Sequence, residues 1–73
     1  MKFGKSKLRR ILSNETGIPV RDIIDHGRYE NYGNKERLVI GGHTITAANG
    51  RVEICSPVVI GESIRYKTRD VEV

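Results

Sequence analysis

The stretch LVIGGHTITAANGRVEIC, residues 38–55, determines the fold, because two glycine-containing turns separate segments in which apolar and polar residues alternate. Asn49-Gly50 is the stronger turn signal, since a type I′ hairpin turn needs positive φ at both central residues and these residue types accept it. This turn sets the register of a hairpin in which Ala48 faces Arg51, Ala47 faces Val52, Thr46 faces Glu53, and Ile45 faces Ile54. A shift of one residue would move every apolar side chain to the polar face.

Gly41-Gly42 extends the same sheet by one strand. A turn at this dipeptide pairs Leu38 with Ile45 and Ile40 with His43, again on the apolar side. The polar side then carries alternate residues of both strands, among them Cys55 opposite Thr44. The alternation predicts an antiparallel meander with one buried face.

Further turn signals flank this core. Gly33-Asn34 is a third hairpin-turn dipeptide, and a turn is also expected at Gly61-Glu62. The apolar residues after position 57 predict one to three further short strands. Pro57 is expected to interrupt the sheet or to mark its edge, because proline cannot donate to a strand ladder.

The first part of the chain has helical periodicity instead. Leu8, Ile11 and Leu12 recur at helical spacing, which predicts a helix over 7–16 that Ser6 caps and Gly17 ends. Pro19 favours the first turn of a second helix over 19–26, which ends at Gly27. The prediction is a single α+β domain, residues 1–73, with two short N-terminal helices packed on an antiparallel β-meander of three to five strands.

The charge of this chain is concentrated at one end. The 73 residues contain 13 lysines and arginines against nine acids, a net charge of +4. The first ten residues contain five of these bases and no acid: Lys2, Lys5, Lys7, Arg9 and Arg10. Such a basic end suits nucleic acid, an anionic membrane or an acidic partner, and it also suits a solvated tail.

The composition and length of the chain limit the cellular compartment and the kind of site that we expect. The single cysteine, Cys55, has no internal partner, which fits a reducing compartment. The longest apolar run, Val58-Val59-Ile60, is too short for a membrane span, so we expect a cytoplasmic protein that does not act in a membrane. A chain of this length has little room for a deep cavity, and a homodimer would bury more surface.

Catalytic and metal-binding residues are few. The spacing of His26, His43 and Cys55 matches no compact zinc pattern, and no phosphate-binding glycine motif occurs. His43 faces Ser56 at the end of the apolar face and is expected to be partly buried and hydrogen-bonded. Asp22 and Asp25 share one side of the second helix and are interpreted as a solvated surface. The prediction is a protein without enzymatic activity, cofactor or metal.

The stretch RRILSNETGIPVRDIIDHGR, residues 9–28, resembles a helix-turn-helix in the small residue Ser13, the turn residue Gly17 and three apolar positions, Leu12, Ile18 and Ile23. With the hairpin that follows, it is similar at the level of the fold to small phage repressors of the Cro type. The resemblance implies DNA contact by the second helix, with Arg21 and Arg28 as its bases.

The stretch also departs from the helix-turn-helix pattern. Only eight residues precede it, and Asp22 and Asp25 would repel phosphates. Eight residues are too few for the first helix of a trihelical core, and without that helix Ile24, on the apolar face of the second helix with Val20 and Ile23, would be left exposed. The alternative interpretation is a plain helical corner.

A polar loop with two tyrosines is expected at 28–37, RYENYGNKER. Tyr29 and Tyr32 lie among bases that include Arg37, a mixture that suits stacking on single-stranded nucleic acid or a protein contact. Alternatively, one tyrosine closes the edge of the core and the other caps the hairpin.

Two functions follow from these patterns. The first is a non-catalytic regulatory module that binds DNA or RNA through a basic N-terminal helix; its candidate residues are Lys2, Lys5, Lys7, Arg9, Arg10, Arg21 and Arg28. The second is a small protein-binding adaptor or inhibitor of the kind that mobile elements encode, with Tyr29, Tyr32 and Arg37 at the partner contact.

Overall fold

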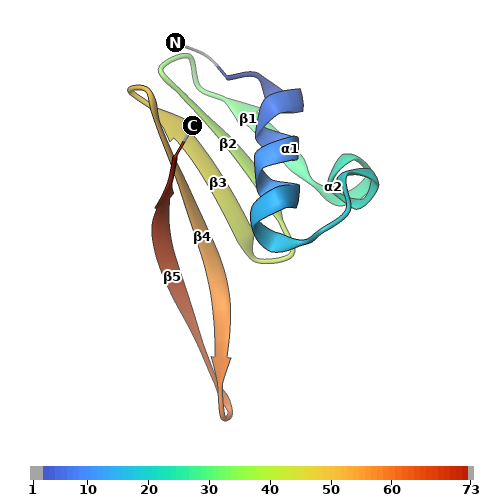
Figure 1. Ribbon diagram of the computed structural model, residues 1–73, viewed down its shortest axis with the longest axis vertical. Helices are drawn as coiled ribbons and strands as arrows, with labels where there is room; N and C mark the ends of the chain where they lie inside the picture. Colours follow the sequence, from blue (N-terminus) through green and yellow to red (C-terminus); the bar gives the residue numbers. More distant parts are fainter. Residues whose placement is uncertain (1–2, 73) are drawn as a thin grey trace.

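Two helices and five strands follow one another in the computed structural model of the protein, which describes residues 3–72 (Figure 1). The elements are α1 (Lys5–Thr16), α2 (Val20–His26), β1 (Arg28–Asn31), β2 (Lys35–Ile40), β3 (His43–Ala48), β4 (Arg51–Ile60) and β5 (Ser63–Val71). All neighbouring strands pair antiparallel, in the order β1-β2-β3-β4-β5. The predicted α+β class, with N-terminal helices on an antiparallel meander, is confirmed.

The register predicted from the Asn49-Gly50 turn is confirmed at every pair. Asn49 and Gly50 have φ values of 54° and 75°, and the pairing runs from Ala48↔Arg51 to Thr44↔Cys55. The Gly41-Gly42 turn also forms as predicted, with Leu38 opposite Ile45. Both turns have the positive φ that their residue types accept, so local sequence determines this part of the sheet.

The expectation of a polar loop at 28–37 is wrong. Arg28–Asn31 and Lys35–Ile40 form the hairpin β1–β2, and Arg28 pairs with Val39. The turn lies at Gly33, which has a φ of 91° and whose amide donates to Asn31 Oδ1 at 2.9 Å. The polar side chains fit a strand because one face of β1 and β2 is open to solvent.

The start of α1 also differs from the prediction. The helix begins at Lys5, two residues early, and its N-cap is Gly4 with a φ of 85°, so Ser6 does not cap it. The carboxylate of Glu36 accepts the Phe3 amide at 2.9 Å and the Gly4 amide at 2.8 Å. Glu36 is only 2% exposed and therefore anchors the start of α1 to the sheet.

The ends of the helices follow the predicted glycines. Gly17 adopts a left-handed conformation, φ 81°, and its amide donates to Ser13 O at 2.8 Å. α2 begins at Val20, with Pro19 as its N-cap. Gly27 ends α2 in an extended conformation, and a Cβ atom there would lie 2.4 Å from the carbonyl oxygen of Ile23. Close packing, not positive φ, therefore requires the glycine at position 27.

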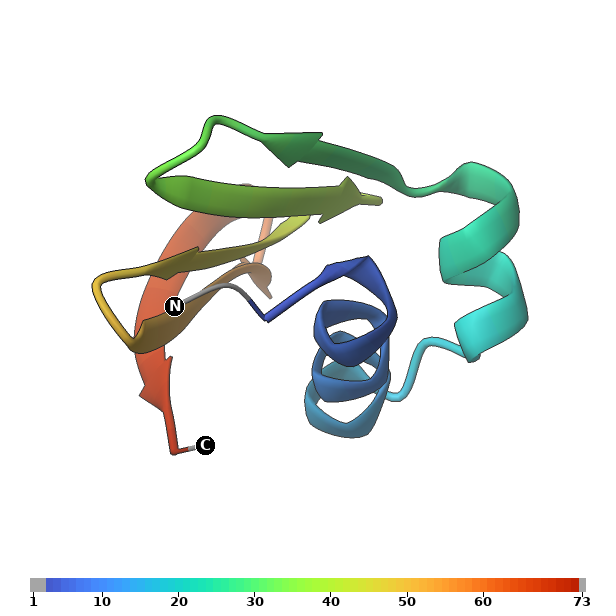
Figure 2. The ribbon, with the colours of Figure 1, turned by 90° about the horizontal axis from the view of Figure 1, so that it is seen from above.

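The core lies between α1, α2 and one face of the sheet (Figure 2). We call this the helix-side face and the opposite one the outer face. The buried apolar residues of the core are Leu8, Leu12, Ile23, Leu38, Ile40, Ile45, Ala47, Val52 and Ile54. Of the three apolar residues of α2, only Ile23 is buried, whereas Val20 and Ile24 are 40% and 52% exposed.

Strands β4 and β5 extend beyond the rest of the sheet as a two-stranded arm (Figure 1). The pairing of β3 with β4 stops at Thr44↔Cys55, whereas β4 and β5 remain paired out to Ile60↔Ser63, around the predicted turn at Gly61. Pro57 does not interrupt β4, contrary to one of the two expectations. It pairs with Tyr66 in the region where β4 has lost its other neighbour, so its missing amide donor costs no ladder hydrogen bond.

Candidate nucleic-acid interface

The exposed side of α1 carries three of the predicted bases. Lys5, Lys7 and Arg10 are all exposed. Lys7 and Arg10 point away from the buried Leu8 and Leu12, and Lys5 is the first residue of the helix. The ammonium group of Lys7 lies 5.2 Å from the centre of the Phe3 ring, a cation–π contact that orients it. These three bases can therefore reach a polyanion that approaches α1.

The other two bases predicted at the N-terminus, Arg9 and Lys2, are not among the exposed bases of α1. Arg9 is half-buried, and its Nε atom is buried with no hydrogen-bond partner among the described residues. Lys2 lies outside the described residues 3–72.

The two remaining candidate bases lie elsewhere. Arg21 is exposed on α2, between the N-terminal end of that helix and the exposed acids Asp22 and Asp25. Arg28 begins β1 on the outer face, and its Nε atom lies 4.0 Å from Glu30 Oε2. The structure does not bring Arg28 and the α1 bases to the same face.

Tyr29 contributes to the edge of the core. It packs against the core cluster, and its hydroxyl donates to Glu36 Oε1 at 2.8 Å. Burial raises the pKa of the Tyr29 hydroxyl, and the hydrogen bond and the negative charge of Glu36 raise it further. Tyr29 therefore occupies the structural position that one interpretation of the sequence gave it.

Tyr32 is largely exposed, whereas the side chain of Arg37 is held by hydrogen bonds. Tyr32 is 50% exposed beside the β1–β2 turn, with Lys35 Nζ 5.1 Å from its ring centre. Arg37 donates to Glu30 Oε1 from Nε at 3.1 Å and from Nη2 at 2.8 Å. This double hydrogen bond lowers the pKa of Glu30. Of the three candidate partner contacts, only Tyr32 presents a largely exposed side chain.

A second group of bases lies on β5 and was missed from the sequence. Arg65, Lys67 and Arg69 are exposed and occur at every second position, opposite Val58, Ser56 and Ile54. Because Ile54 is in the core, this row lies on the helix-side face. The spacing Arg-x-Lys-x-Arg was the available signal, but it required a strand whose register was known.

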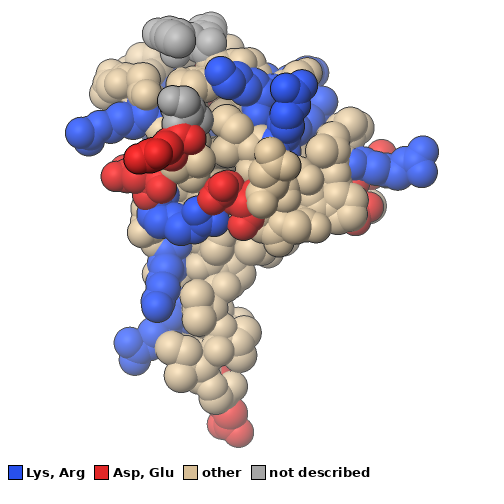
Figure 3. Space-filling view, in the orientation of Figure 1, with Lys and Arg blue, Asp and Glu red and all other residues tan. Residues whose placement is uncertain are grey.

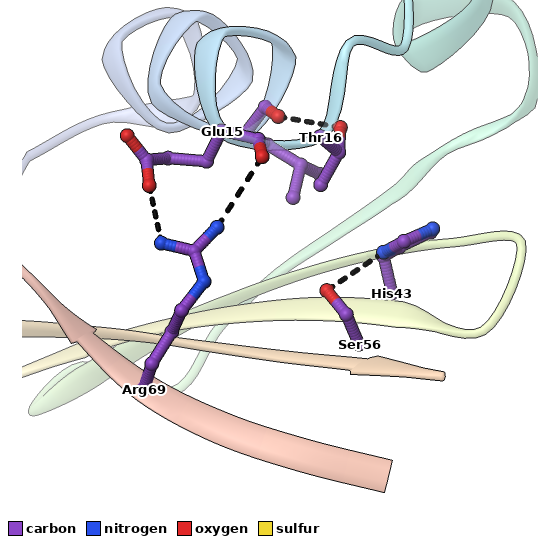
Figure 4. Close-up of polar contacts among 6 residues, drawn as sticks. Glu15, Thr16, His43, Ser56 and Arg69 are labelled. Atoms are coloured by element: carbon purple, nitrogen blue, oxygen red, sulfur yellow. Dashed lines mark hydrogen bonds and ion pairs between the residues drawn. The ribbon is translucent and has the colours of Figure 1, made fainter. Parts of the chain in front are cut away.

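Both groups of bases are visible from one side of the molecule. Figure 3 shows basic side chains over α1 and again along β5, with acidic side chains between them. Arg69 binds part of that acidic group: its Nη1 pairs with Glu15 Oε1, and its Nη2 donates to the Glu15 carbonyl oxygen at 3.3 Å (Figure 4). This contact links the end of α1 to β5.

His43 and Ser56 form the pair predicted from the register. Both are half-buried, and His43 Nδ1 lies 2.8 Å from Ser56 Oγ (Figure 4). A histidine can activate a serine at this distance, but acyl transfer also needs a group that orients the histidine and donors for an oxyanion. The hydrogen-bonded, partly buried histidine expected from the sequence is confirmed.

Two open depressions lie on the surface of the described residues. One of about 360 Å³ lies between the Asn49-Gly50 turn and the end of β5, where Arg51, Asp70 and Glu72 line it. Residues 3–72 contain no group of three or more histidine, cysteine or acidic side chains that could hold a metal ion. Neither described helix is long and apolar enough to cross a membrane.

Comparison of the chain with protein families, characterised proteins and solved structures finds no match.

Proposed function

We propose that this protein is a small non-catalytic module that binds the phosphate backbone of DNA or RNA through its helix-side face. The observation that supports this function most is the occurrence of two basic groups on that face, from parts of the chain far apart in sequence. The groups are Lys5, Lys7 and Arg10 on α1, and Arg65 and Lys67 on β5.

The availability of these bases supports the proposal. None of the five forms an ion pair with a carboxylate among residues 3–72, whereas Arg28, Arg37 and Arg69 do. All five are exposed, so a phosphate can replace water around each without breaking an ion pair. Contacts of this kind provide affinity and orientation but carry no base sequence information.

In this proposal α2 does not enter a DNA groove, although the helix-turn-helix resemblance implies that it does. α2 has seven residues, and its exposed side includes Asp22 and Asp25 beside Arg21. Two carboxylates on a short helix would oppose its entry into a groove lined by phosphates. Contact by α1 and β5 avoids that cost.

A salt titration of labelled duplex DNA and single-stranded RNA tests the proposal, with fluorescence anisotropy as the readout. With three to five phosphate contacts on duplex DNA, log K should fall against log salt with a slope of roughly −3 to −4.5. Lys7→Gln with Arg10→Gln, and separately Arg65→Gln with Lys67→Gln, should each reduce the slope by about 2.

The matched control removes two charges from the outer face. Lys35 and Arg51 are exposed, and both lie one residue away from side chains that face the core. Lys35→Gln with Arg51→Gln should leave the slope unchanged. A salt response that is flat, or equal reductions in all three double variants, would refute the proposed interface.

A protein-binding adaptor is the second candidate, and the exposed side of α2 favours it. Val20 and Ile24 are 40% and 52% exposed, and the acids Asp22 and Asp25 flank them. An apolar patch bordered by acids suits a basic protein partner. A specific partner that Val20→Ser with Ile24→Ser releases, together with no nucleic-acid binding at physiological salt, would support the adaptor instead.

A further inference from the structure

The β4–β5 arm exposes apolar side chains on its outer face. Strand alternation places Pro57, Val59, Ile64 and Tyr66 together there, as the cross-strand pairs Pro57↔Tyr66 and Val59↔Ile64. Val59 is 70% exposed, and Ile64 and Tyr66 are each 62% exposed. Ile60, at the tip, is 55% exposed. Ile60 has the parity of the core residue Ile54 and lies on the helix-side face, so it is not part of this group. We call the four residues Pro57, Val59, Ile64 and Tyr66 the arm patch.

A ribbon of two strands is marginally stable in water unless another element covers one face. Here the last five pairs of β4 with β5 lie beyond the pairing of β3, so no other strand within residues 3–72 supports them. Both helices pack at the other end of the molecule (Figure 1). The arm therefore lacks the helices that cover the helix-side face of the rest of the sheet.

We infer that the arm patch is an interface between two copies of this chain. The four paired residues include no charged side chain, so two copies can bring their patches together without opposing like charges. A twofold arrangement is the simplest one in which a surface meets itself, because each patch then contacts its own counterpart.

The other surfaces of the arm oppose self-association. The free edge and the helix-side face of β5 carry Arg65, Lys67 and Arg69. Antiparallel pairing of β5 with a second β5, centred on Lys67, would place Lys67 opposite Lys67 and Arg65 opposite Arg69. Like charges directly opposite one another destabilise a strand pair, and charged edges are a common means of preventing it.

The area of the patch agrees with a reversible dimer. At these exposures the side chains present on the order of 400 Å² of apolar surface, the size of the largest patch on a typical monomer, which is often functional. Two copies would bury on the order of 800 Å² from these side chains alone, and Cys55 and Thr68 at the border would add to it. This is below the roughly 1,000 Å² of a stable specific contact, so we expect weak, reversible association that requires protein concentrations on the order of 100 µM.

Such a dimer would leave the helix-side faces of both copies open, because the arm patch lies on the opposite face. Self-association is therefore independent of the proposed nucleic-acid binding. Because the interface is apolar, association should persist at high salt, where phosphate contacts weaken. The two proposals can thus fail separately.

Sedimentation equilibrium at about 5 µM and about 300 µM protein tests the inference. The mass should rise from near 8.2 kDa toward twice that value as the concentration increases. Val59→Thr with Ile64→Thr keeps β-branched side chains but should hold the protein monomeric at both concentrations. Ile24→Thr, which changes an apolar side chain that is 52% exposed on α2, should associate like the wild type.

A second measurement covers the case in which the double variant does not fold. In a Cys55→Ser background, Ile64→Cys should be crosslinked by a bis-maleimide reagent, whereas Ile24→Cys should not. A wild type that stays monomeric at about 300 µM, a double variant that still associates, or equal crosslinking at both positions would overturn the inference. Monomeric protein that instead sediments with anionic vesicles would assign the patch to lipid and overturn it as well.

Discussion

Glu36 provides the sharpest test of how the chain is held together. Within residues 3–72, its buried carboxylate accepts hydrogen bonds from the Phe3 amide on Oε2, and from the Gly4 amide and the Tyr29 hydroxyl on Oε1. Glu36→Gln replaces one acceptor oxygen by an amide group of nearly the same size. If the glutamine keeps its oxygen at the Oε1 position, its NH₂ group faces the Phe3 amide, and two donors then oppose each other.

The expected loss of stability follows from these contacts. A buried hydrogen bond to a charged group contributes about 1.5–3 kcal/mol, and an unsatisfied buried donor costs about 1–3 kcal/mol. We therefore expect Glu36→Gln to reduce the free energy of unfolding by about 1–3 kcal/mol. Glu36→Ala leaves all three donors without this acceptor and also creates a cavity, so we expect a loss of at least about 4 kcal/mol. That loss is most of the stability of a 73-residue domain.

Urea denaturation followed by circular dichroism measures both losses. Amide hydrogen exchange should also quicken at Phe3 and Gly4 in Glu36→Gln, because those donors lose their acceptor. Glu53→Gln is the matched control, since Glu53 is exposed on β4 and should change the midpoint little. A Glu36→Gln variant within about 0.5 kcal/mol of the wild type would show that the carboxylate does not anchor α1.

The other predictions concern the turns and Tyr29. Asn49→Ala with Gly50→Val should destabilise the protein by about 2–3 kcal/mol, because both positions have positive φ; an unchanged urea midpoint would contradict this. Gly27→Ala should destabilise the end of α2, since its Cβ would lie 2.4 Å from the Ile23 carbonyl oxygen, and a midpoint equal to that of wild type would be the contrary result. The raised pKa of Tyr29 means that its contribution is complete below the ordinary value of 10.0 and is lost as the pH rises through the folded-state pKa. Stability measured across this range should therefore fall at alkaline pH, and Tyr29→Phe should make that fall shallower; identical profiles would exclude the effect.

Much of the sheet could be predicted from the sequence because the signals are local. Asn49-Gly50 and Gly41-Gly42 each define a turn within two residues, and the alternation beside them admits one register. The ends of both helices at Gly17 and Gly27 could be predicted for the same reason.

The start of α1 could not be predicted in this way. Ser6 is a better cap than Gly4 when only neighbouring residues are considered. The carboxylate that anchors this end comes from Glu36, more than thirty residues further along the chain. The register did contain a signal, since Glu36 lies opposite Ala47 on the buried face. A charged residue at such a position is expected to be exposed to solvent unless its hydrogen-bond partners are known.

For the candidate interface too, some residues could be predicted from the sequence and others could not. The N-terminal bases are evident from composition, because five of them occur in ten residues without an acid. Only the tertiary structure shows that Arg65 and Lys67 lie on the same side of the molecule as α1, while Arg28 lies on the outer face. The physical reason is that a side chain's face on a strand depends on the parity of a register carried through every preceding turn. Sequence thus determined which residues are charged and which turns form, and the packing of α1 on the sheet decided which charges meet.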